Sequence, residues 1–161
     1  LLPQSQLDRF TVRLKMGYPD HDSHVSILRE RNTDQPLDHV QQVVSRQDIL
    51  VMQDEVEQIV VRDELFSYIT DLAEWTRHTK DISLGLSPRG ALAIVRMAKA
   101  NAYINGRAYL VPQDIVDVFP AVTAHRIIIS PKAKIAGVST DEILETCLST
   151  IKTPKLVSTG A

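Results

Sequence analysis

Two arginines stand in short motifs that suit chemistry at a phosphoryl group. Arg9 lies in Leu7-Asp8-Arg9-Phe10, and Arg89 lies in Gly85-Leu86-Ser87-Pro88-Arg89-Gly90. Arginine is always charged and offers a planar fork of donors, so it can bind phosphate oxygens and the charge that develops during phosphoryl transfer. The sequence contains no Gly-rich loop of the form G-x-x-x-x-G-K-[ST], so nothing in it can cradle a nucleotide alone. The two motifs therefore indicate part of a nucleotide site.

Arg89 stands at the start of a predicted helix. Ser87 is a favourable N-cap and Pro88 a favourable first residue, and the pattern predicts a helix from Arg89 to about Asn105 that Gly106 terminates. The free N–H groups at this helix start attract the same anion as the guanidinium. At about 100° per residue, one face of the helix is basic: it carries Arg89, Arg96, Lys99 and Arg107. For the last three, a solvated helix surface is the simpler explanation.

Arg9 has a different setting. Gln4 to Arg9 resembles a short helix, and Phe10 to Met16 alternates apolar and polar residues as a strand does, up to the turn Gly17-Tyr18-Pro19. A strand without a partner leaves backbone groups unsatisfied, so we expect its sheet to lie in sequence that this chain lacks. From composition alone, an ordinary ion pair between Arg9 and Asp8 is the simpler explanation of this arginine.

The rest of the chain has helical periodicity. Asp22 or Ser23 can cap a first helix, and Ser45 with Asp48 resembles a capping arrangement for a second. Helical spacing or capping residues then recur over residues 65–80, 89–105, 112–126 and 139–152. We therefore expect a mainly α fold: a small helical bundle over residues 20–153, preceded by a short helix and one strand left from a truncated α/β core.

Composition sets bounds on the class of protein. The chain has 161 residues, of which 43% are hydrophobic and 24% charged, as in a folded globular protein. No apolar run approaches the roughly 20 residues that span a bilayer, and no signal segment opens the chain, so we expect a cytoplasmic location. Cys147 is the only cysteine, which excludes an internal disulfide and favours a small buried hydrophobe. Acidic residues dominate positions 34–64 and basic residues positions 71–110, a segregation that would suit self-association.

Five motifs in this order resemble the C-terminal portion of MoxR-type AAA+ ATPases. They are residues 2–10, Gly17-Tyr18-Pro19, Thr76-Arg77, residues 85–89 and Ala124-His125-Arg126-Ile127. Together they cover residues 1 to about 153. The resemblance implies three parts: residues 1–19 as the end of the AAA+ core with the arginine-finger segment and last strand, residues 20–153 as a helical AAA+ lid domain, and residues 154–161 as a flexible tail.

The resemblance also implies roles for both arginines. Arg9 would be the arginine finger, which acts in trans at the nucleotide of the adjacent subunit in a ring. Arg89 would be the sensor 2 residue of the lid, contacting the γ-phosphate of the nucleotide held by its own subunit. The sequence thus predicts two separate nucleotide sites.

The whole protein, by the same resemblance, would couple ATP binding and hydrolysis to chaperone-like remodelling of partner proteins. It would form a ring, expected to be a hexamer, and a von Willebrand A-domain protein would be its partner. ATP and Mg²⁺ would be bound mainly by a core with Walker A and Walker B segments, so we expect this fragment to be inactive and to hold no cofactor or metal.

Two other functions are consistent with parts of the sequence. A helical nucleic-acid-binding module would use the basic face of the helix from Arg89, although the formal net charge is −2. A stand-alone hydrolase would use histidines and acids, but His21 and His24 do not form an H-E-x-x-H frame. His125 is expected to pack or hydrogen-bond at the end of the bundle.

Overall fold

The computed structural model describes residues 2–32 and 35–155. The chain divides into two units, one formed by the residues up to 13 and from 54 onward, the other by residues 14–53. The boundary expected after residue 19 falls inside the second unit, so the assignment of residues 1–19 to a core and 20–153 to a lid stays a prediction. Of the tail expected over 154–161, residues 156–161 lie outside the described residues.

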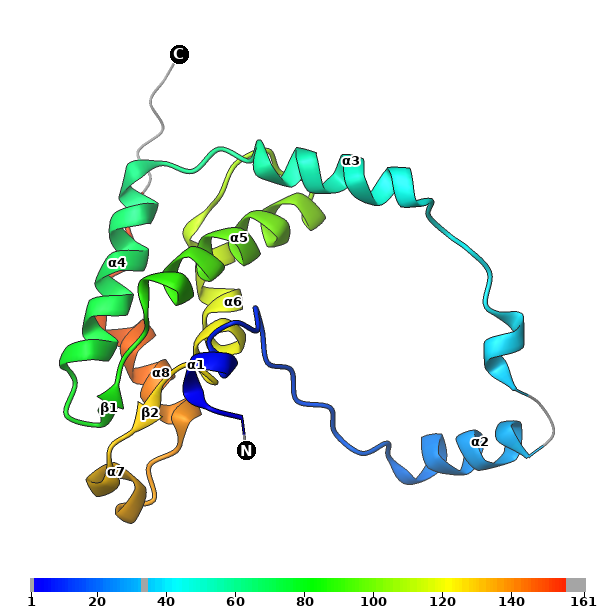
Figure 1. Cartoon of the computed structure of the whole chain (residues 1–161), viewed down its shortest axis with the longest axis horizontal. Helices are drawn as coiled ribbons and strands as arrows, with labels where there is room; N and C mark the ends of the chain where they lie inside the picture. Colours follow the sequence, from blue (N-terminus) through cyan, green and yellow to red (C-terminus); the bar gives the residue numbers. More distant parts are fainter. Residues whose placement is uncertain (1, 33–34, 156–161) are drawn as a thin grey trace. The chain divides into compact units, whose positions relative to one another are not determined.

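Helices around one hydrophobic core make up the larger unit (Figure 1). α4 (Asp63–His78), α5 (Pro88–Ile104), α6 (Pro112–Thr123) and α8 (Thr140–Thr150) contact one another through their apolar stripes. The fully buried side chains include Leu65, Leu72, Ile94, Phe119 and Leu144, each contributing about 1.5–3 kcal/mol through burial. Cys147 is also fully buried, as expected, and burial raises the pKa of its thiol to about 12. The predicted mainly α fold is confirmed.

Capping residues fix the ends of these helices where the sequence predicted. The Ser87 hydroxyl accepts a hydrogen bond from the Gly90 N–H at 3.1 Å and so caps α5. α5 ends at Ile104 with Asn105 as its C-cap, and Gly106 follows with a φ of 69°, the left-handed conformation that glycine adopts readily. At α8, the Glu142 N–H donates to the Ser139 hydroxyl at 3.2 Å, and the Ser139 N–H donates to the Glu142 carboxylate at 2.7 Å.

The strand expected over Phe10–Met16 is not formed within the described residues, and the sequence placed its pairing partner in residues that this chain lacks. After α1 (Gln4–Leu7) this segment has no regular secondary structure, because a strand forms only where another strand pairs with it and none of the described residues does so here. The strands that do occur are short: β1 (Ile82–Leu84) pairs antiparallel with β2 (Ile128–Ile129). A short helix, α7 (Pro131–Ile135), follows β2 and was not predicted.

The smaller unit contains α2 (His21–Arg31), the 3₁₀ helix η1 (Pro36–His39) and most of α3 (Arg46–Glu57). Asp20, rather than Asp22 or Ser23, caps α2: its carboxylate accepts the Ser23 N–H at 2.8 Å. The predicted capping at α3 is confirmed, since the Asp48 N–H donates to the Ser45 hydroxyl at 3.1 Å and the Ser45 N–H to the Asp48 carboxylate at 2.7 Å. Neither α2 nor α3 buries a side chain.

Across residues 2–32 and 35–155, every helix is too short or too polar to cross a bilayer. The cytoplasmic location expected from the sequence stays a prediction.

Candidate functional site

Arg9 and Arg89 border the same pocket, although they are 80 positions apart in the sequence. The pocket has a volume of about 450 Å³, a size typical of small-molecule sites. It is lined by Asp8, Arg9, Thr11, Arg89, Leu92, Ala93, Arg96 and Arg126. The sequence predicted two separate sites for the two arginines, whereas the structure brings both to one surface.

Three guanidinium groups at this pocket are available to a ligand. Arg9, Arg89 and Arg96 are exposed, and within the part of the chain that the structure describes their side chains make no hydrogen bond or ion pair. Arg89 and Arg96 lie seven positions apart on α5, which places them on one face about 10 Å apart along its axis. The pocket therefore combines three cations that have no partner within the described part of the chain with the N-terminus of α5, an arrangement that attracts a polyanion.

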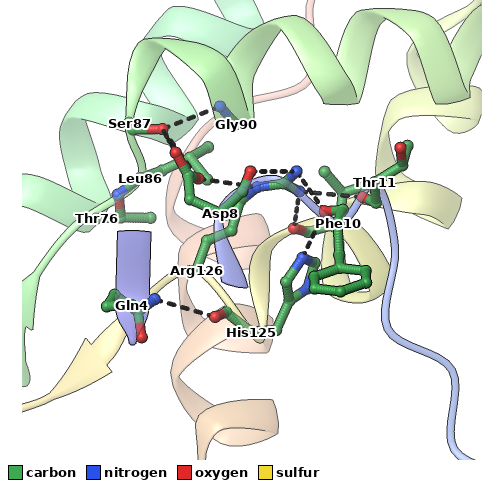
Figure 2. Close-up of polar contacts among 11 residues, drawn as sticks. Gln4, Asp8, Phe10, Thr11, Thr76, Leu86, Ser87, Gly90, His125 and Arg126 are labelled. Carbon is green, nitrogen blue, oxygen red and sulfur yellow. Dashed lines mark hydrogen bonds and ion pairs between the residues drawn. The ribbon is translucent and has the colours of Figure 1, made fainter. Parts of the chain in front are cut away.

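The pocket's carboxylate, Asp8, is engaged by other residues than Arg9. The Ser87 hydroxyl donates to both of its oxygens, at 3.1 and 3.0 Å, and Arg126 Nε donates to Oδ1 at 3.1 Å (Figure 2). The ordinary ion pair between Arg9 and Asp8 that the sequence suggested is therefore not formed. The carboxylate of Asp8 neutralises the charge of the buried Arg126, so it does not compensate the charge of its neighbour Arg9.

Arg126 is the most heavily bonded residue of the site, and only 3% of it is exposed. Nη2 donates to the carbonyl oxygens of Phe10 (2.6 Å) and Asp8 (3.3 Å), and Nη1 to those of Thr11 (3.0 Å) and Val122 (2.5 Å). With the Nε bond to Asp8, all five N–H donors of the guanidinium are used. Burial lowers the pKa of Arg126, and the charge of Asp8 and the hydrogen bond to it oppose that shift.

His125 adds a second attachment for the same N-terminal segment. Its Nε2 donates to the carbonyl oxygen of Phe10 at 2.9 Å, and the Gln4 side-chain amide donates to the carbonyl oxygen of His125 at 3.1 Å (Figure 2). Nδ1 is buried without a partner among the described residues. Burial lowers the pKa of His125, and the nearby charge of Arg126 adds to that effect. The expected hydrogen-bonding role of His125 is confirmed.

The loop before α5 is fixed from α4. Thr76 Oγ1 accepts the Leu86 N–H at 2.9 Å, and Arg77 Nε donates to the Leu86 carbonyl oxygen at 2.8 Å. Gly85 is required by this close approach, because a Cβ at this position would lie 2.8 Å from the Arg77 backbone nitrogen. The pair Thr76-Arg77 thus sets the position at which Ser87 and Arg89 enter the helix.

Four of the five sequence motifs meet in this one network, and Gly17-Tyr18-Pro19 belongs to the other unit. Sequence reasoning treated Asp8 only as a partner for Arg9, and it overlooked Arg126 as an organising residue. Both residues could have been singled out because each lies inside one of the five motifs. An arginine beside an apolar run such as 127–129 also has no obvious reason to face solvent.

The basic face predicted on the helix from Arg89 is not continuous. Lys99 donates to the carbonyl oxygen of Glu57 at 2.8 Å. Arg107 binds Asp114 through two hydrogen bonds of 2.6 Å each. Two of the four basic residues thus make contacts within the protein. The continuous basic face on which the prediction of a nucleic-acid-binding module depended is therefore lost.

Comparison with known proteins agrees with this architecture. Residues 74–147 match the family model described as the AAA lid domain. A crystal structure from Cytophaga hutchinsonii, described as a candidate ATPase, superposes with a TM-score of 0.87 at 32% identity, over 96% of this chain and 50% of that one.

Curated relatives extend the match beyond the lid. The uncharacterized protein YeaC of Bacillus subtilis is 33% identical over 95% of this chain and 48% of its own length. Chaperone MoxR1 of Mycobacterium tuberculosis is 27% identical over 96% of this chain and 43% of its own length. Protein MoxR of Methylorubrum extorquens is 51% identical over 47 residues. The chain spans about half the length of the first two relatives.

Residues 74–147 of the helical bundle therefore correspond to an AAA lid domain. The lid and the segment that precedes it belong to the C-terminal part of a MoxR-type AAA+ ATPase.

Proposed function

We propose that this chain completes ATP sites in a ring of MoxR-type subunits, and that the full-length protein uses ATP hydrolysis for chaperone-like remodelling of partner proteins. The observation that carries the proposal is the pocket with three guanidinium groups, Arg9, Arg89 and Arg96, that have no partner among the residues that the structure describes. Phosphoryl groups are the ligands whose charge and oxygen geometry such guanidinium groups suit.

Arg9 acts as the arginine finger in trans. Its side chain is exposed beside a segment that Arg126 and His125 hold in place, so it can project from a fixed backbone toward a neighbouring subunit. A finger of this kind neutralises charge that develops on the transferred phosphoryl group, and contributes about 10³ to 10⁵ in kcat in nucleotide hydrolases.

Arg89 acts as sensor 2, with the γ-phosphate as its partner. It lies in the first turn of α5, where the N–H groups of the helix start reinforce its charge. Loss of the γ-phosphate on hydrolysis removes that partner, so the lid and the segment that carries Arg9, which the Ser87–Asp8 hydrogen bonds join, can move together relative to the nucleotide.

ATP with Mg²⁺ fits this chain as a ligand held mainly by other residues. The pocket offers cations to the phosphates, and its carboxylate, Asp8, is already bound by Ser87 and Arg126, so the chain supplies charge neutralisation rather than metal ligands. Phosphate-loop and metal-binding residues come from a Walker-type core. A hexameric ring and a von Willebrand A-domain partner complete the proposal, following the resemblance.

The test of the two arginines uses mixed rings of the full-length protein. Arg9→Ala should lower kcat by about 10³-fold or more while rings still assemble. Mixing Arg9→Ala subunits with subunits altered at the phosphate-loop lysine should restore turnover, because an intact finger then meets an intact nucleotide site. Unchanged turnover by Arg9→Ala rings would contradict the finger assignment.

The same mixture separates the role of Arg89. Arg89→Ala should weaken nucleotide binding and slow turnover. If Arg89 serves its own subunit's nucleotide, mixing Arg89→Ala with the phosphate-loop variant restores nothing. Recovery would instead show that Arg89 shares the neighbour's nucleotide with Arg9, as the common pocket allows.

A further inference from the structure

We propose that Asp8 is a positioning residue that links Arg9 to Arg89, so that the arginine finger and the sensor 2 helix are held as one rigid part. This inference rests on the proposed function and deepens it. Asp8 precedes Arg9 in the chain, and Ser87 lies two positions before Arg89. The hydrogen bonds between Asp8 and Ser87, at 3.0 and 3.1 Å, therefore join the two arginine-bearing segments directly.

The Ser87 hydroxyl performs two functions with one oxygen. The oxygen accepts a hydrogen bond from the Gly90 N–H and so caps α5, while its O–H donates a hydrogen bond to Asp8 (Figure 2). Any displacement of the Asp8 segment must therefore break a bond at the first turn of the helix that carries Arg89. The Ser87 hydroxyl oxygen is therefore both the cap of the helix and the link between the two segments.

Arg126 binds both the carboxylate and the backbone of Asp8. Its Nε contacts the Asp8 carboxylate, and its Nη atoms contact the carbonyl oxygens of Asp8, Phe10 and Thr11. Arg9 thus has a bound residue on each side, although its own side chain contacts no partner among residues 2–32 and 35–155. A network in which every guanidinium N–H of Arg126 is bound holds one geometry, which is what a group acting on a transferring phosphoryl group requires.

The test uses the full-length ATPase and a double-mutant cycle. Asp8→Ala should lower kcat by at least tenfold and raise the nucleotide dissociation constant several-fold, because both arginines lose their position. Asp8→Ala added to Arg9→Ala should have little further effect on kcat, since an unpositioned finger and an absent finger are equivalent.

Ser87→Gly provides a milder second variant. Glycine keeps most of the capping preference at this position, so the helix should persist while the link to Asp8 is lost. We expect a several-fold reduction in kcat with rings still assembled, even where Asp8→Ala does not fold.

Asp114→Asn is the matched control. It weakens a comparable carboxylate–arginine pair in the same lid, and Asp114 does not border the pocket. It should reduce thermal stability but leave kcat within about twofold of the wild type. Equal kcat losses in the Asp8 and Asp114 variants at equal stability loss would reduce Asp8 to a structural role.

The failure of this inference is distinguishable from failure of the proposed function. If Arg9→Ala loses turnover while both Asp8→Ala and Ser87→Gly retain it, only the link is refuted. Additive effects of Asp8→Ala and Arg9→Ala also refute it. If Arg9→Ala itself retains turnover, the finger assignment fails first.

Discussion

Two carboxylate–arginine pairs hold this bundle, and their exposures are opposite. In the pair beside the pocket, Arg126 is 2% exposed and Asp8 is 23% exposed. In the pair at the other end of α5, Asp114 is 1% exposed and Arg107 is 25% exposed. One pair buries its cation among backbone carbonyls, and the other buries its anion among N–H donors.

The difference shows how similar pairs can serve different purposes. Asp114 accepts from Arg107, the Val111 N–H and the Asn101 amide, all from α5, α6 and the loop that joins them, so it closes a local turn. Arg126 binds residues more than 110 positions away, so it attaches a separate segment. Only the pair of Arg126 and Asp8 borders the pocket. A change in that pairing, but not in the pairing of Arg107 with Asp114, would therefore alter the positions of Arg9 and Arg89.

Arg126→Met should have the largest effect on the comparison. It removes five hydrogen bonds and leaves the acceptors of the N-terminal segment without donors, so we expect a loss of about 3–5 kcal/mol in the free energy of unfolding. Chemical denaturation of the 161-residue chain measures this. Hydrogen exchange should show the segment around Phe10 losing protection first, and retained protection there would mean that other contacts hold the segment.

Asp114→Asn should cost less, about 2 kcal/mol, because asparagine can still accept the Val111 N–H and Arg107 can reach water. Burial alone would raise the pKa of Asp114, but the hydrogen bonds from Arg107, Val111 and Asn101 lower it below its ordinary value. A lowered folded pKa gives stability that is present above about pH 4 and is lost as the pH falls further. Denaturation at a series of pH values should therefore show a steeper acid loss in the wild type than in the variant.

His125 should give the smallest effect, in a different pH range. Because its folded pKa lies below the ordinary value of 6.5, the unfolded chain takes up a proton first as the pH falls below 6.5, and stability decreases from there. His125→Gln, which can still donate to Phe10, should flatten that slope and leave the acid loss from Asp114 in place. An unchanged slope near pH 6 would assign it to another group.

Most helices could be predicted, because their signals are local. Ser87-Pro88, Ser139 with Glu142, and Gly106 act within one turn of the helix that they begin or end. α7 was missed although Ser130-Pro131 carries the same signal, since five residues give too little periodicity. The strand predicted over Phe10–Met16 depends on a distant partner, because alternation describes one segment and pairing needs a second, and none of the described residues pairs with it.

The site could be predicted only in part. Motifs indicated Arg9 and Arg89, but nothing in the spacing showed that they border one pocket. That proximity depends on Arg126, which reads in sequence as one more charged residue. Likewise, the pattern places Arg96, Lys99 and Arg107 on one helical face. Only tertiary contacts distinguish Arg96, which has no partner in the part of the chain that the structure describes, from the other two.

Because every guanidinium N–H group of Arg126 is hydrogen-bonded, this residue limits where the protein can be divided or recombined. Four of its five N–H groups reach the stretch from Asp8 to Thr11, and a lysine could not satisfy so many acceptors in these directions. A lid grafted onto a foreign ATPase without its own residues 4–11 would carry a buried cation with no counterpart. The unit that can be exchanged is therefore the lid together with residues 4–11. Exchanges whose boundary lies at the first helix of the lid should fail.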